Sequence, residues 1–127
     1  MNNNEYRELN PSERGVLDKL LSSQFVGVDQ IREQVSSANV KTILDGAGNF
    51  WGIEFKVKSN VKADVQERVP VSAISRKNGP CEILLHVIDG TVKELELVQY
   101  DDQIPNDFPS ADDIEVRLNN DTMNSRG

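Results

Sequence analysis

The chain is poor in the residues that build disulfides, metal centres and membrane spans. Its 127 residues include one cysteine, Cys81, and one histidine, His86. A lone cysteine cannot form an intramolecular disulfide, and its place in an apolar run is typical of a core residue in a reducing compartment. One His and one Cys disfavour a zinc site, so we expect no metal and no cofactor. No apolar run approaches the ~18–20 residues of a membrane helix.

The polar N-terminus has no charged segment followed by an apolar core, so we expect no signal peptide and a cytoplasmic protein. Basic residues are scarce as well, with 14 Lys and Arg against 21 Asp and Glu and a formal net charge of −7. This charge disfavours nucleic acid and anionic membranes as direct partners and favours basic proteins. The excess is local, because residues 89–121 hold ten acidic and two basic residues. A solvated edge is the alternative interpretation of such a charge run.

Two helices are predicted at the start. Asn10 can cap a helix over residues 11–23, with Pro11 at its first position and Glu13 three residues after the cap. Leu17, Leu20 and Leu21 then follow helical spacing. A second helix is expected after Asp29 as its cap, with an apolar face formed by Val28, Ile31, Val35 and Ala38.

From Val40 the pattern alternates, as in strands. We expect strands at 40–44, 50–59, 68–76, 81–88 and 91–100, while 59–67 is polar and undecided. Trp51 alternates with Ile53 and Phe55 and is therefore expected in the core. Short links favour pairing in sequence order. The predicted fold class is α+β, with two N-terminal helices packed on one face of an antiparallel meander of about five strands. Residues 10–118 form one domain in this interpretation, between a polar lead-in, 1–9, and a polar tail, 119–127.

The hairpin around Asp89-Gly90 organises the rest of the chain. A two-residue turn would pair Leu85 with Glu94, so we expect a three-residue loop that pairs Val87 with Thr91. Ile83 then meets Leu95, and Cys81 meets Leu97. The core face holds Ile83, Leu85, Leu95 and Leu97. The other face would carry Glu82, Leu84, His86, Val92, Glu94, Glu96, Val98 and Tyr100. Exposed apolar residues among charges are typical of protein-binding surfaces, although a late loop could cover them instead.

Catalytic chemistry finds little support in the sequence. Cys81 and His86 lie five apart on one strand and so on opposite faces, which excludes a dyad. His86 could act with Glu94 across the hairpin as a general acid or base. An ordinary strand histidine is the simpler interpretation, so we predict no catalytic residue and no enzyme.

Two stretches carry a resemblance to known proteins. Residues 7–14 (RELNPSER) with Leu17, Leu20 and Leu21, and residues 90–97 (GTVKELEL), look like two blocks of a family of small uncharacterised bacterial proteins. Small acidic bacterial proteins of this shape resemble the immunity proteins of contact-dependent and other polymorphic toxin systems. The resemblance implies a cognate toxin, often a basic nuclease domain.

The first hypothesis is therefore an immunity protein, a monomer or weak homodimer, that neutralises a basic toxin domain by binding it. Its expected contact residues are Glu94, Glu96, Val98, Tyr100, Asp101, Asp102, Asp107, Asp112 and Asp113. The alternatives are a structural or adaptor module that self-associates through the hairpin face, and a small enzyme that uses His86.

Overall fold

The computed structural model describes residues 5–77, 80–100 and 107–119. Helix α1 spans Pro11–Leu20, three residues shorter than predicted. The predicted cap is confirmed: Asn10 accepts a hydrogen bond from the Glu13 amide at 2.8 Å, and Glu13 accepts one from the Asn10 amide at 2.9 Å. This reciprocal pair satisfies two amides that the start of a helix leaves free.

Helix α2 spans Val28–Ser36, and its cap differs from the prediction. The cap is Gly27, in the left-handed region at φ 93°, and no side chain caps the helix. Asp29 already lies inside the first turn, where its carboxylate pairs with Arg32 at 2.7 Å. A side chain at residue 27 would meet Val65 and Asp64, so the tight approach of the 57–70 loop requires glycine there.

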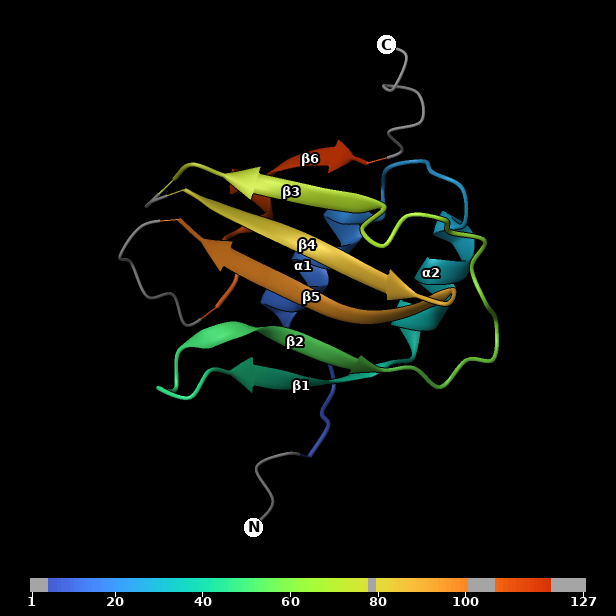
Figure 1. The fold of residues 1–127 in the computed structure, drawn as a ribbon, viewed down its shortest axis with the longest axis horizontal. Coiled ribbons are helices and arrows are strands. Elements are labelled where there is room, and N and C mark those ends of the chain that lie inside the picture. The colour runs from blue at the N-terminus through green and yellow to red at the C-terminus, as the bar shows by residue number, and fades with distance from the viewer. Residues whose placement is uncertain (1–4, 78–79, 101–106, 120–127) are drawn as a thin grey trace.

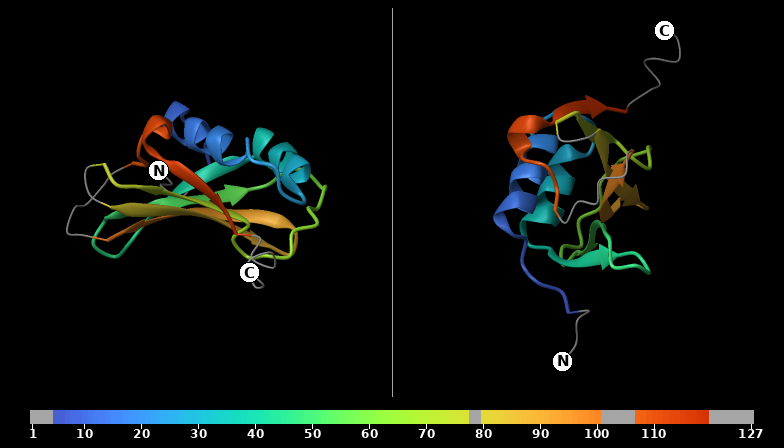
Figure 2. Two further views of the ribbon diagram at one scale, coloured as in Figure 1. Left: turned by 90° about the horizontal axis from the view of Figure 1, so that it is seen from above. Right: turned by 90° about the vertical axis from the view of Figure 1, so that its left-hand side faces the viewer.

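Six strands form one antiparallel sheet within the described residues, with the spatial order β1-β2-β5-β4-β3-β6. The strands are β1 (Asn39–Leu44), β2 (Phe50–Lys56), β3 (Val71–Ser75), β4 (Cys81–Ile88), β5 (Thr91–Gln99) and β6 (Glu115–Leu118). The predicted α+β class is confirmed. Figures 1 and 2 show α1 and α2 on the same side of the sheet, so the molecule has a helix layer and a sheet layer. Side chains from both layers form one buried core that includes Leu17, Ile31, Ile53, Leu85 and Leu95.

The predicted meander of about five strands is wrong in two respects. Strand β2 pairs with β5 and not with β3, because residues 57–70 carry the chain without regular structure past the end of the sheet (Figure 1). Strand β6 was not predicted, and it pairs with β3 at the sheet edge. Four residues are a short signal, and the acidic residues around them obscured the alternation of Val116 and Leu118.

The buried Gln34 explains how the β4–β5 hairpin is anchored. Its side-chain amide donates to the carbonyls of Val61 and Gly90, both at 2.8 Å, and its oxygen accepts from the Val92 amide at 2.9 Å. Ala63 also donates to the Gly90 carbonyl at 2.9 Å. Helix α2 and the 57–70 loop are therefore joined at the turn of the hairpin. Nothing in the sequence pattern pointed to this role for Gln34.

The predicted hairpin register is wrong, although the residues on its core face are right. Asp89 and Gly90 form a two-residue turn with φ 52° and 76°, which is the geometry that matches strand twist. Lys93 is then an extra, bulged residue on β5, since Val87 pairs with Val92 and His86 with Glu94. Beyond the bulge Leu85 pairs with Leu95, Ile83 with Leu97 and Cys81 with Gln99. The bulge removes the apolar–charged mismatch of a two-residue turn and turns Val92 into the core, where it is fully buried.

The N-terminal segment, part of the expected polar lead-in, packs on the domain. Arg7 exchanges two backbone hydrogen bonds with Val40, at 2.8 and 2.7 Å, and Leu9 is buried. Cys81 is buried, as predicted for a core residue. In the part of the chain that the structure describes, every helix is too short or too polar to cross a membrane.

Candidate binding surface

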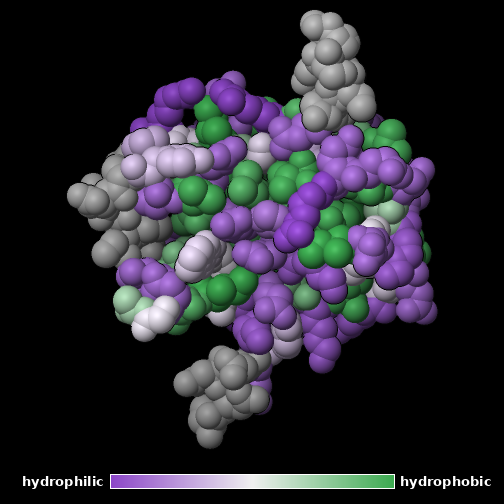
Figure 3. Space-filling model, in the orientation of Figure 1, coloured by the Kyte–Doolittle hydropathy of each residue, from purple (hydrophilic) through white to green (hydrophobic). Residues whose placement is uncertain are grey.

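The face of the sheet turned away from the helices, which we call the open face, combines carboxylates with apolar side chains. Figure 3 shows hydrophobic residues scattered among hydrophilic ones across it. The helices and the core occupy the other side of the sheet (Figure 2). By pairing and alternation, the open face includes Trp51, Glu54, Ile74, Glu82, Leu84, His86, Glu94, Glu96, Val98 and Tyr100. The cations Lys41, Lys56 and Arg117 lie on the same face, toward its two edges.

The structure divides the predicted contact residues between the two sides of the molecule. Glu94, Glu96, Val98 and Tyr100 lie on the open face. Asp112 and Asp113 belong to a short 3-10 helix, η1 (Ala111–Asp113), which lies beside α1 on the helix side (Figure 2). Lys19 of α1 donates to the Ala111 carbonyl at 2.9 Å and fixes η1 there.

Asp107 lies near the helix side too. It precedes Phe108, whose buried ring meets Phe50 edge to face at 5.1 Å. Asp101 and Asp102 fall outside the described residues. The predicted acids that the structure describes therefore do not form one surface.

Trp51 joins the open face through a bulge that sequence alternation could not reveal. Ile43 pairs with Gly52 and Leu44 with Phe50, which leaves Trp51 as an extra residue between them. The prediction that Trp51 lies in the core is therefore wrong: it is 46% exposed, and its indole N–H donates to Glu96 at 3.3 Å. Gly52 makes this possible. Its φ is 142°, and a Cβ would collide with the Leu95 carbonyl on β5.

Three carboxylates run along the middle of the open face, and two of them are held by aromatic donors. Glu54 and Glu94 are directly opposite each other on β2 and β5, and Glu96 is opposite Gly52. The Tyr6 hydroxyl donates to Glu54 at 2.6 Å, a bond that raises the pKa of Tyr6. Trp51 donates to Glu96. Like charges directly opposite each other in a sheet are destabilising, so this arrangement has an electrostatic cost.

His86 hydrogen-bonds to Glu96 and not to Glu94, the partner expected from the sequence. Its Nε2 lies 2.7 Å from Glu96 Oε1, while Arg68 Nε donates to its Nδ1 at 3.3 Å. An arginine N–H can only donate, so Nδ1 is the acceptor in the contact with Arg68, and Nε2 faces the Glu96 carboxylate. His86 thus links a cation to a carboxylate, and both of its nitrogens are occupied.

Glu94 is the carboxylate without a partner. Among the described residues no side chain donates a hydrogen bond to it and no cation pairs with it. Its partial burial raises its pKa, and the nearby Glu96 and Glu54 add to the increase, while His86 and Arg68 oppose it. The centre of the open face therefore holds a carboxylate that is partly removed from water and has no ion pair or side-chain hydrogen bond within the described part of the chain.

Tyr100 forms a second aromatic element at the end of β5. It is 62% exposed, and its hydroxyl donates to Glu82 at 2.6 Å, which raises the pKa of Tyr100. The ring is therefore fixed at its polar end while its faces remain in solvent. Trp51 has the same character, because its indole N–H is bound and nearly half of the side chain is exposed.

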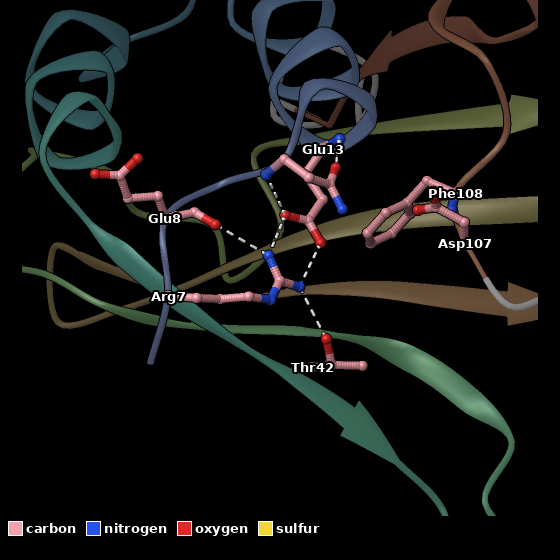
Figure 4. Close-up of polar contacts among 7 residues, drawn as sticks. Arg7, Glu8, Glu13, Thr42, Asp107 and Phe108 are labelled. Carbon is pink, nitrogen blue, oxygen red and sulfur yellow. Dashed lines mark hydrogen bonds and ion pairs between the residues drawn. The ribbon is translucent and has the colours of Figure 1, made fainter. Parts of the chain in front are cut away.

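The helix side carries a different carboxylate network, drawn in Figure 4. Glu13 is 1% exposed, and its carboxylate forms a bidentate pair with Arg7 at 2.9 and 2.8 Å. Arg7 also donates to Thr42 of β1 at 2.8 Å and to the Glu8 carbonyl at 3.1 Å. The bond to Glu13 raises the pKa of Arg7. This network joins the start of α1 to the edge of the sheet.

Two shallow clefts lie on the helix side, away from the open face. One of about 390 Å³ lies between α1 and α2 and is lined by Arg14, Asp18 and Arg32, with four neighbours. The other, of about 330 Å³, lies between α1 and η1. Neither contains a histidine, and in residues 5–77, 80–100 and 107–119 no three His, Cys, Asp or Glu side chains are grouped to hold a metal ion.

Comparison with known proteins gives no relative: no family profile, no curated protein and no solved structure matches this chain.

Proposed function

We propose that this chain is a cytoplasmic inhibitor of the immunity-protein kind, which neutralises a basic toxin domain by binding it through the open face. The observation that carries the proposal is the uncovered side of the sheet, where Glu54, Glu94 and Glu96 share one face with the exposed rings of Trp51 and Tyr100. Charged groups around aromatic anchors are typical of protein interfaces, in which Tyr and Trp supply much of the binding energy.

The carboxylates at the middle of the open face suit a basic partner in association rate as well as in affinity. Complementary charge steers encounter and raises the association rate, an effect that salt weakens. The same charge disfavours self-association, because two open faces in contact would oppose one row of carboxylates to another. A monomeric inhibitor is therefore preferred to the adaptor that pairs through its hairpin. The His86 enzyme has less support still, since both ring nitrogens are already bonded.

Co-expression with the protein encoded immediately upstream tests the proposal. Wild type should form a stable complex with that protein and suppress its toxicity in a growth assay. The double substitution Glu94→Gln with Glu96→Gln removes two charges from the open face and should weaken the complex at least about tenfold. Its matched control, Asp112→Asn with Asp113→Asn, removes the same charge from η1 and should bind as wild type does. The absence of any complex would refute the proposed function.

A further inference from the structure

No cation among the described residues forms an ion pair with Glu94, and His86 and Arg68 act on it only through space. Arg68 donates to His86, and Lys41 and Lys56 lie over the Tyr6 ring at 5.1 and 5.4 Å. Glu54 and Glu96 have their own donors in Tyr6 and Trp51. The chain thus satisfies the two outer carboxylates of the row by itself and leaves the central one to be satisfied from outside.

The aromatic residues around the row are held in a way that exposes their faces. The indole N–H of Trp51 and the hydroxyl of Tyr100 already have hydrogen-bond partners within the chain. The ring faces of these two side chains remain exposed to a partner, next to negatively charged carboxylates. A planar guanidinium fits this combination, because it stacks on aromatic faces and pairs bidentately with a carboxylate. A lysine ammonium lacks both the plane and the fork.

We propose that the open face docks a protein surface that presents arginine, with one guanidinium pairing with Glu94 while the Trp51 ring, beside Glu96, offers a stacking surface to the same partner. This inference rests on the proposed function and names the chemistry of its partner. It assigns the interface to β2, β5 and β4 and leaves η1 outside it. The apolar side chains of Leu84 and Val98, half-buried on neighbouring strands, extend the contact beyond the charged row.

A titration of the full chain with a blocked arginine, N-acetyl-arginine amide, tests the docking chemistry without the partner. Amide and indole chemical shifts are followed by NMR at constant ionic strength. We expect saturable shifts at the Trp51 indole and at the amides of residues 94–96. Glu94→Gln should raise the dissociation constant about fivefold, and Asp112→Asn with Asp113→Asn should leave it unchanged. The blocked neutral analogue, N-acetyl-citrulline amide, should give no saturable shift.

The inference is overturned if the shifts do not saturate, if citrulline gives equal shifts, or if Glu94→Gln leaves the dissociation constant unchanged. Equal affinity for N-acetyl-lysine amide would also overturn it, since a simple cation preference would then suffice. The two proposals fail separately. If blocked arginine does not bind but the double variant still loses the upstream protein, the inhibitor function stands and the arginine assignment falls. If blocked arginine binds at Glu94 and the upstream protein forms no complex, the inhibitor function falls.

Discussion

Glu13 and Glu94 are two glutamates that the fold treats in opposite ways. Glu13 is fully buried on the helix side. Its carboxylate forms an ion pair with Arg7 and accepts a hydrogen bond from the Asn10 amide at the start of α1. Glu94 is partly buried on the open face, stands opposite another glutamate and pairs with nothing among the described residues. The first carboxylate is more deeply buried and yet fully compensated.

The difference separates what holds this fold together from what it offers to a partner. A buried charge is tolerable only when hydrogen bonds and an opposite charge replace water, which is what Arg7 provides for Glu13. A half-buried carboxylate without an ion pair lowers stability, and a cation from a partner would recover that loss on binding. The fully paired carboxylate therefore lies on the helix side, and the open face is the side to which we assign binding.

The largest effect on stability should come from a substitution at Gly52, the residue of β2 next to the bulged Trp51. Its φ of 142° and its close approach to the Leu95 carbonyl leave no room for a Cβ. Gly52→Ala should lower the free energy of unfolding by about 3 kcal/mol and displace Trp51. Thermal denaturation and near-ultraviolet circular dichroism measure the two effects. Gly46→Ala is the matched control, because nothing lies within 4 Å of the added carbon. Equal stability of the two variants would disprove the strained bulge.

On the helix side, Glu13→Gln should be the next most damaging change. It keeps the shape of the side chain but removes the charge that pairs with Arg7, which is itself partly exposed and can return to water. We expect a loss of about 2 kcal/mol, seen as a melting temperature lower by roughly 5–10 °C. Glu8→Gln, at an exposed position in the adjacent segment, should change almost nothing. A melting temperature for Glu13→Gln within a degree of that control would contradict the role assigned to the pair.

The helix-side network was only half visible in the sequence. Asn10, Pro11 and Glu13 are local signals at fixed spacing, so the cap of α1 could be predicted. The pairing of Glu13 with Arg7, and of Arg7 with Thr42, joins residues that only the folded sheet brings together. A local pattern contains no information about such a contact.

Most residues of the open face could be predicted from the sequence, but the two bulges that shape it could not. Alternation along β4 and β5 correctly separated the core leucines from the carboxylates. Two bulges, at Trp51 and Lys93, then shifted the alternation by one residue and moved Trp51 out of the core and Val92 into it. An inserted residue reverses the facing of every side chain beyond it, and the sequence marks it weakly. The glycine at position 52 was the available signal for the first of them.

Glu94→Gln should stabilise the free protein, in contrast to Glu13→Gln. The pKa of folded Glu94 is raised above that of the unfolded chain, chiefly by burial. A group with a raised pKa in the folded state stabilises the fold when it is protonated. The contribution of Glu94 to the free energy of unfolding is therefore complete at a pH below its pKa in the unfolded chain, and it is lost as the pH rises through its pKa in the folded chain. Above that range the variant should be more stable than wild type by about 0.5 kcal/mol, and the gap should close in acid. Denaturant unfolding from pH 4 to 8 measures it, with exposed Glu33→Gln as the control. A gap that does not change with pH would show that the charge of Glu94 is not what destabilises the free protein.

The smallest effect is expected at η1, where the double substitution Asp112→Asn with Asp113→Asn removes two charges from the helix side. Asp112 is exposed, and Asp113 makes one long ion pair with Lys77 at 3.6 Å, so each contributes little to stability. The free energy of unfolding should stay within about 0.5 kcal/mol of wild type. Binding of the upstream protein, measured by calorimetry at two salt concentrations, should also be unchanged. A loss of binding as large as that of the open-face double variant would contradict the assignment of the interface to the open face. It would also show that charge alone, wherever it lies on the chain, attracts the partner, and the aromatic residues of the open face would then have no part in recognition.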